Sequence, residues 1–321
     1  MEVAPNIFLV KLPLPFKLDH VNCYLCRGNN GWTIIDTGLN YPPSTIVWKK
    51  TFDNLGLKYS DITAIYVTHY HPDHFGSAGW LQELTGAPVY MHRNEDVFIE
   101  QMWKKGRVNI PVIGDLFKEH GMPPGLVDEV LDNLTGIWSV VQPYPVLSFI
   151  SEGDRVEIGG RIFDIILTPG HSDGHICFLC REEGLLISGD HLLSKISSNI
   201  SLWPASHPNP LESYLSSLKM IADLPVSKVL TAHGPEVNDC RGRVEELLEH
   251  HRDRLEQVSM LTGSGATAYS ICTRLFGTDL NLHEIRFALT ETLAHLACLE
   301  SRGHVFSRQD AGIVIYRKVN Q

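Results

Sequence analysis

Four side chains of the types that bind metal ions fall within six residues, in the run Thr68-His69-Tyr70-His71-Pro72-Asp73-His74. The apolar segment 64–68 precedes them and predicts a short buried strand. Because alternate residues of an extended chain point the same way, His69 and His71 can share one metal ion. Asp73 and His74 follow the bend at Pro72 and can turn toward a second ion. Imidazole and carboxylate ligands in this order predict a centre for metal-assisted hydrolysis.

Three further residues of the same chemical types follow predicted strands. His171 comes after the strand 161–167, Asp190 after 185–188 and His233 after 229–232. The carboxyl ends of strands are where sheets flanked by helices commonly build their sites. Together the seven side chains suit two metal ions: three histidines on one, an aspartate and two histidines on the other, and one bridging carboxylate.

The run His69-x-His71-x-Asp73-His74, followed in order by His171, Asp190 and His233, resembles the pattern of the metallo-β-lactamase superfamily. The segments 22–25 (Asn-Cys-Tyr-Leu) and 34–38 (Ile-Ile-Asp-Thr-Gly) are similar to the opening strands of that family, and the likeness covers nearly all of residues 1–235. The resemblance implies an α+β fold, a four-layer αββα sandwich with the metals at one edge. It also implies that His69, His71 and His171 hold the first metal, that Asp73, His74 and His233 hold the second, and that Asp190 bridges.

Two features indicate which branch of that superfamily the sequence resembles. True β-lactamases typically lack the bridging aspartate and often use a cysteine ligand, so Asp190 and His233 favour the glyoxalase II-like branch. The segment His233-Gly234-Pro235 and the long helix predicted after it are similar to the lactamase-β-like-2 group.

The expected activity is hydrolysis of a small-molecule thioester, ester or lactone by a hydroxide shared between two divalent metals. Zinc is the first expectation, with iron and manganese as alternatives. Asp73 would orient the nucleophile while it binds metal. We expect His191, directly after Asp190, to contact the substrate. Asn199 and Trp203, in the loop that follows, are further candidates for substrate binding, although plain loop packing explains each of them better.

Two neighbouring residues could support the ligands from outside. Asp36 could orient a ligand histidine, although a plain turn before Thr37-Gly38 explains it equally well. His175 is expected to have a structural role and not to bind metal.

The chain divides into a catalytic domain, residues 1–240, and a C-terminal winged-helix-like domain, residues 241–321. Short β-rich runs at 7–12, 21–27 and 32–36 predict an opening meander. Residues 93–147 differ in sequence pattern from the strand-forming segments on either side. They are interpreted as a helical insertion that shapes the substrate cleft. After 241 the pattern predicts a long helix, two more helices near 267–276 and 283–301, and a hairpin at 304–307 and 312–318.

A metal-dependent endoribonuclease of the lactamase-β-like-2 type is the alternative function. Residues 241–321 carry 10 Lys+Arg and 10 Asp+Glu, and the whole chain has a net charge of -10. A nucleic-acid-binding module normally has a positive excess, so nucleic acid is not the expected partner. We therefore expect the C-terminal domain to serve packing or dimerisation, in a possible homodimer.

Composition predicts a globular protein of the cytoplasm. The N-terminus has no basic, then apolar, leader pattern, and no stretch reaches the length of a membrane helix. The seven cysteines, among them Cys23 and Cys26, have no framework spacing and are interpreted as buried thiols. Sixteen histidines are an unusual number, which metal binding would explain.

Overall fold

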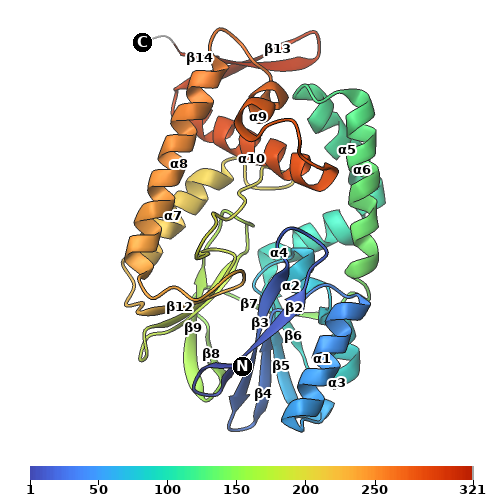
Figure 1. Cartoon of the computed structure of the whole chain (residues 1–321), viewed down its shortest axis with the longest axis vertical. Coiled ribbons are helices and arrows are strands. Elements are labelled where there is room, and N and C mark those ends of the chain that lie inside the picture. Colours follow the sequence, from blue (N-terminus) through green and yellow to red (C-terminus); the bar gives the residue numbers. More distant parts are fainter. Residues whose placement is uncertain (320–321) are drawn as a thin grey trace.

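Two β-sheets packed face to face form the centre of the fold (Figure 1). The computed structural model describes residues 1–319, apart from the side chains of residues 107 and 108. The larger sheet contains, in spatial order, β1 (Glu2–Ala4), β2 (Ile7–Pro13), β3 (His20–Gly28), β4 (Gly31–Ile35), β5 (Ile62–Tyr66), β6 (Val89–His92) and β7 (Leu147–Ile150). The smaller sheet contains, in spatial order, β12 (Lys228–Thr231), β11 (Leu185–Gly189), β10 (Ile176–Cys180), β9 (Arg161–Leu167) and β8 (Arg155–Ile158).

The space between the sheets is filled by alternate residues of facing strands. Ile35 and Tyr66 of the larger sheet belong to the same buried cluster as Phe163, Phe178 and Leu230 of the smaller one. Since side chains alternate across a strand, the other face of each sheet is left for helices to cover.

Helices cover both outer faces, which completes the predicted αββα order. On the larger sheet lie α1 (Pro42–Leu55) and α3 (Ala78–Thr85). The short helices η1 (Tyr59–Asp61) and α2 (Pro72–Phe75) come between them in the chain. Trp48 and Phe52 of α1 are buried there with Leu81 of α3. On the smaller sheet lies α7 (Pro210–Ala222), whose Leu211 and Leu218 are fully buried. Asn209 caps α7 by accepting the Glu212 N–H, with Pro210 in the first turn, as the sequence predicts.

The helical insertion lies between β6 and β7. It consists of α4 (Arg93–Phe98), the π-helix η2 (Ile99–Lys104), α5 (Gly106–Glu119), α6 (Pro124–Thr135) and the 3₁₀ turn η3 (Gly136–Val140). These helical elements, residues 93–140, lie within the segment 93–147 that was interpreted as a helical insertion. In Figure 1, α5 and α6 rise from the sheets toward the C-terminal helices.

Three helices and a hairpin follow the sandwich: α8 (Cys240–Thr262), α9 (Ala268–Phe276), α10 (Leu282–Ser301), β13 (Val305–Asp310) and β14 (Ile313–Lys318). The predicted order of helices and hairpin is confirmed. Asn281 and Glu284 form a capping box that begins α10. α10 packs against α6, α7, α8 and α9.

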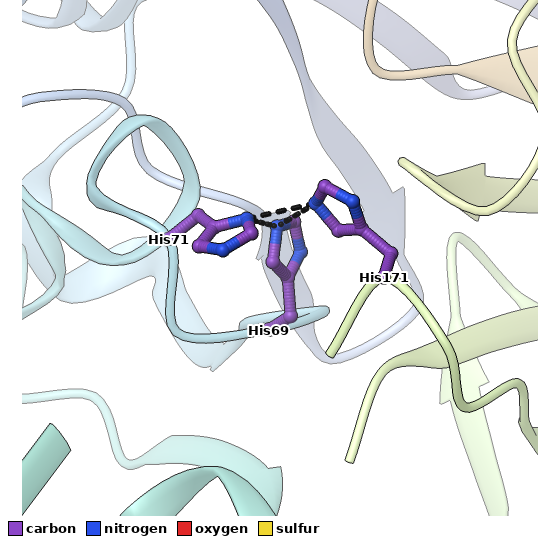
Figure 2. Close-up of side chains that lie close together, drawn as sticks. All are labelled: His69, His71 and His171. Atoms are coloured by element: carbon purple, nitrogen blue, oxygen red, sulfur yellow. Dashed lines mark hydrogen bonds between the residues drawn. The ribbon is translucent and has the colours of Figure 1, made fainter. Parts of the chain in front are cut away.

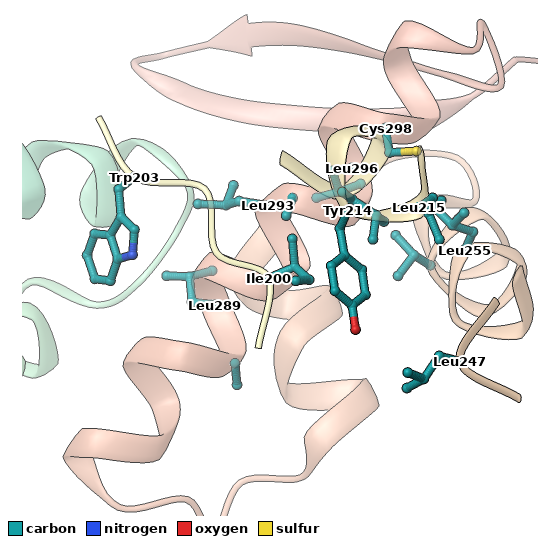
Figure 3. Close-up of a cluster of buried hydrophobic side chains, with 14 of the residues drawn as sticks. Ile200, Trp203, Tyr214, Leu215, Leu247, Leu255, Leu289, Leu293, Leu296 and Cys298 are labelled. Carbon is teal, nitrogen blue, oxygen red and sulfur yellow. The ribbon is translucent and has the colours of Figure 1, made fainter. Parts of the chain in front are cut away.

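One hydrophobic cluster runs from the smaller sheet through α7 into the C-terminal helices. Figure 3 shows Tyr214 and Leu215 of α7 beside Leu289, Leu293 and Leu296 of α10. The C-terminal helices thus share a core with the sandwich, and the domain boundary at residue 240 stays a prediction.

Several elements differ from the sequence-based expectations. The patterns at α1, β7 and β10 predicted no element, because these segments lack a distinctive motif or lie beside Gly-rich or Pro-rich turns.

All seven cysteines are buried and free, as expected. Among residues 1–319, no helix combines the length and the apolar character that crossing a membrane requires.

Candidate metal centre

Three imidazole nitrogens meet at the carboxyl edge of the two sheets. His69 follows β5, His71 precedes α2 and His171 follows β9. His69 Nε2 lies 3.0 Å from His71 Nδ1, which lies 2.7 Å from His171 Nε2, and the two Nε2 atoms are 3.1 Å apart. Figure 2 shows the three rings converging on one point. Nitrogens held this close together, on three separate rings, match the donor set of one divalent ion.

A second group lies beside the first. His233 Nε2, after β12, lies 3.3 Å from Asp73 Oδ2, and His74 Nε2 lies 3.8 Å from the same oxygen. Asp190 stands between the two groups. Its Oδ2 lies 3.4 Å from His171 Nε2, and its Oδ1 lies 3.4 Å from both His74 Nε2 and His233 Nε2.

Polar atoms without hydrogen-bond partners identify what this arrangement is suited to hold. Among the described residues, three atoms of the cluster are buried and have no hydrogen-bond partner: His74 Nε2, His233 Nε2 and Asp190 Oδ1. Such atoms are costly unless something pairs with them. Five histidines and two carboxylates that face one another therefore fit divalent cations.

The charges in the cluster agree with that fit. Burial lowers the pKa of His69 and of His71 well below the ordinary value, which keeps both rings neutral and able to coordinate. Burial acts in the opposite direction on Asp73, but His74 and His233 hold the pKa of this carboxyl at about 2. The same imidazoles keep Asp190 ionised despite its burial, because they hold its pKa well below the usual range.

Partners outside the cluster determine which nitrogen of each ring is free. His171 Nδ1 donates to the Asn199 carbonyl over 2.8 Å, and His233 Nδ1 donates to the His20 carbonyl over 3.0 Å. His74 Nδ1 donates to Asp36 Oδ2 over 2.8 Å. Because each Nδ1 donates to a fixed acceptor, Nε2 is the nitrogen of each ring that faces the centre. Despite burial, the carboxylates of Asp190 and Asp73 raise the pKa of His74 and of His233, so a metal ion would replace a proton on these two rings.

Asp36 therefore has the orienting role that the sequence left open. Its carboxylate also accepts the Thr68 N–H over 2.8 Å and the Thr68 hydroxyl over 3.0 Å. The Thr68 hydroxyl in turn lies 2.9 Å from His69 Nδ1, so Asp36 supports one histidine of each group.

Tight backbone approaches bring the strand-end loops together. At Gly189, where φ is +49°, a Cβ atom would lie 2.8 Å from His175 Nε2 and 3.0 Å from Thr68. His175 Nε2 accepts the Asp190 N–H, which positions the aspartate. The expected structural role of His175 is consistent with this contact.

Comparison with known proteins decides the family. A family model described as the metallo-beta-lactamase superfamily matches residues 17–233, more than half of the chain. The chain belongs to the metallo-β-lactamase superfamily. A second model, described as the metallo-beta-lactamase-like C-terminal domain, matches residues 255–319.

One named relative covers nearly the whole chain, and a second covers about three quarters of it. The chain is 25% identical over 329 residues to the "Probable metallo-hydrolase YqjP" of Bacillus subtilis, covering 98% of this chain and 99% of that protein. It is 24% identical to the "Beta-lactamase-like protein 2 homolog" of Caenorhabditis elegans over 77% of this chain and 66% of that protein, which is just under two thirds. A crystal structure of a metallo-beta-lactamase family protein from Thermus thermophilus superposes with a TM-score of 0.90 at 32% identity, covering 99% of this chain and 100% of that one.

A buried glutamate that the sequence patterns did not single out joins two of the ligand loops of this metallo-β-lactamase fold. Glu95 Oε2 accepts the N–H of Tyr70, between His69 and His71, over 2.7 Å. Its Oε1 accepts the N–H of Gly174, in the loop after His171, over 2.6 Å. Burial raises the pKa of Glu95 to about 7. The only sequence signal was an acidic residue in the first turn of a helix, which is common.

A cavity of about 870 Å³ opens from the centre. The insertion contributes Met102, Trp103 and Ile137 to its wall, which is consistent with the expectation that residues 93–147 shape the cleft. The loop between β2 and β3 contributes Phe16 and Lys17.

Of the three residues considered as substrate contacts, two line the cavity and one does not. Asn199 and Trp203 line this cavity. His191 does not line it, and that expectation is wrong: the ring is fully buried behind the centre, 5.3 Å from the ring of Tyr214. The turn at Gly189-Asp190 directs Asp190 toward the centre and leaves the next side chain pointing into the core.

The first half of α10 forms another wall of the cavity. Asn281, His283, Arg286 and Phe287 line it. The C-terminal helices therefore form part of the cavity wall in addition to the expected packing, and dimerisation stays a prediction. Arg286 was missed, although a single arginine on an otherwise apolar helix face is itself a signal.

Proposed function

We propose that this metallo-β-lactamase-fold chain is a dinuclear metal-dependent hydrolase of small-molecule thioesters, esters or lactones. One observation carries the proposal: Asp190 presents one oxygen to each of two groups of converging imidazole nitrogens, at the end of a cavity large enough for a small molecule. The relative named as a metallo-hydrolase supports the reaction class.

The seven side chains divide between two ions. His69, His71 and His171 would hold the first, Asp73, His74 and His233 the second, and Asp190 both. Divalent metals in such a pair lower the pKa of bound water toward neutrality and polarise the carbonyl that is attacked. Zinc is our first proposal because imidazole ligands dominate the set, and iron or manganese would also suit histidines and carboxylates without thiolate.

The chain's own residues position the reactants. Asp73 turns Oδ2 toward His233, which leaves Oδ1 to accept a hydrogen bond from the attacking water. The apolar wall, with Trp103 and Trp203, holds the body of the substrate and excludes bulk water.

A small molecule fits this cavity better than RNA does. Among the described residues of the wall, only Lys17 and Arg286 are basic, and Lys17 pairs with Glu284 over 2.5 Å. A nucleic-acid backbone is usually bound by several cations. The endoribonuclease hypothesis remains an arm of the test.

The test measures metal content and hydrolysis together. We expect about two metals per chain, turnover of thioesters, esters or lactones, and loss of turnover after chelation that metal restores. His71→Ala should lower kcat/KM on the order of 100-fold or more, because it removes a ligand of the first ion. His304→Ala, which removes an exposed histidine of the C-terminal segment, is the control and should change neither quantity.

Undiminished turnover in chelated protein would contradict the proposal. So would cleavage of single-stranded RNA with no turnover across thioesters, esters and lactones, which would favour the nuclease instead.

A further inference from the structure

Arg286 is a buried cation without an anionic partner. Its side chain lies on α10 at the cavity wall and the residue is only 4% exposed. No carboxylate of residues 1–319 forms an ion pair with its guanidinium, and its Nε is buried without a hydrogen bond. Burial lowers the pKa of Arg286 to about 10, which leaves it charged at neutral pH. An unpaired charge in this position is costly, so a role outside folding is expected.

The two glutamates of α10 that line the cavity are already engaged. Glu284 binds Lys17 and also caps α10. Glu291 accepts a hydrogen bond from Asn199 over 2.8 Å, and burial raises the pKa of this carboxyl to about 7. Neither carboxylate neutralises Arg286.

The neighbours of Arg286 hold its guanidinium in place without neutralising it. The group lies 4.4 Å from the centroid of the Phe287 ring and 5.9 Å from that of Trp203. Its Nη2 donates to His283 Nδ1 over 3.2 Å. His283 stacks on Phe16 with 4.4 Å between ring centroids. Because His283 accepts at Nδ1, its Nε2 carries the proton and offers a second donor beside the guanidinium.

We propose that Arg286 binds a carboxylate of the substrate, so that the preferred substrates are small acyl compounds with an apolar body and one carboxylate away from the scissile bond. A guanidinium presents a planar pair of donors that matches a carboxylate. One such cation balances one negative charge, whereas a phosphodiester chain needs several. The aromatic wall around it suits the apolar body. This inference rests on the proposed hydrolase function.

Matched esters test the inference directly. The substrates are the mono-4-nitrophenyl esters of succinate, glutarate and adipate, each against the uncharged ester of the same acyl length. We expect metal-loaded protein to prefer the charged member at least tenfold at one or more lengths. Arg286→Gln should lower kcat/KM for that member about 10- to 100-fold and leave the uncharged ester within about threefold, since one charged hydrogen-bonding partner is lost.

Arg93→Gln is the control variant. Arg93 also places a guanidinium on a phenyl ring, 4.1 Å from the centroid of Phe149, but it does not line the cavity. This substitution should leave both esters unchanged. A loss on both esters in Arg286→Gln, with a lower midpoint of thermal unfolding, would show a structural role and overturn the inference. So would equal turnover of charged and uncharged esters by both proteins.

A binding measurement separates this inference from the proposed function. Free glutarate should raise the unfolding midpoint of the metal-loaded protein and do so less in Arg286→Gln at equal metal content. If no ester is turned over, the hydrolase proposal fails, and glutarate binding that depends on Arg286 still supports the carboxylate site. Glutarate binding that is equal in both proteins overturns it.

Discussion

At the scale of the single residue, the hydrogen bond between Asp36 and His74 decides whether the second group can coordinate. The carboxylate accepts from His74 Nδ1, from the Thr68 N–H and from the Thr68 hydroxyl. Its backbone φ is +58°, a conformation that asparagine also tolerates. A change from Asp to Asn at this position therefore alters hydrogen bonding more than backbone geometry.

We predict that Asp36→Asn weakens metal binding about 10- to 100-fold while the protein stays folded. With the amide nitrogen toward His74, the imidazole must accept at Nδ1, so its Nε2 becomes protonated and cannot bind metal. With the amide flipped, two donors oppose each other at the Thr68 N–H. Metal titration with circular dichroism in parallel measures the effect. Unchanged metal affinity would contradict this role for Asp36.

The sequence predicted the seven residues of the centre because their types and spacing are restricted by coordination chemistry and by strand ends. Arg286 and Glu95 could not be found this way. Each lies alone on a helix, and each acquires its neighbours only when segments far apart in the chain pack together. His191 shows the converse, since its sequence position beside Asp190 says nothing about the side of the turn on which it lies.

At the scale of the elements, α4 connects two loops that belong to different sheets. Glu95, in its first turn, bonds the loop after β5 and the loop after β9 with one oxygen each. These loops carry His71 and His171, whose nitrogens are 2.7 Å apart. The spacing of the first group therefore depends on this helix.

Glu95→Gln should destabilise the protein by about 1–3 kcal/mol, because the amide nitrogen cannot accept from a backbone N–H and leaves a buried donor unpaired. Binding of the first metal should weaken as well. Chemical denaturation and metal titration measure the two effects. Glu129→Gln, an exposed change on α6, is the matched control. If Glu95→Gln behaves like this control, α4 does not determine the spacing.

Helices and strands were predictable where the local hydrophobic pattern alone identifies the element. The runs at β5, β9 and β11 are apolar and short, and α8 has a long periodic face, so each was predicted. The contribution of α10 to the cavity was not, because the same apolar face suits both packing and a cavity wall. Only the three-dimensional arrangement places its first turns above the metal centre.

At the scale of the whole molecule, the shared core predicts that sandwich and C-terminal helices unfold together. Leu293 of α10 is 1% exposed within the cluster that includes Tyr214 of α7 (Figure 3). All six tryptophans lie before residue 240, and Trp203 lies 5.9 Å from the guanidinium of Arg286, so tryptophan fluorescence reports on the catalytic part and on its contact with α10. A substitution in α10 that changes this fluorescence transition would show coupling between the two parts.

We predict that Leu293→Ala lowers the free energy of unfolding by about 2–5 kcal/mol, as a cavity in a packed core does. The midpoints by tryptophan fluorescence and by circular dichroism should fall together, because a shared core unfolds as one unit. Met260→Ala, a change at a side chain that is 58% exposed on α8, should move neither midpoint appreciably. A Leu293→Ala protein whose fluorescence midpoint stays in place while circular dichroism splits into two steps would show that the C-terminal helices unfold alone. In that case α10 would reach the cavity as a separately folding wall, and the position of Arg286 would depend on the stability of the C-terminal helices alone.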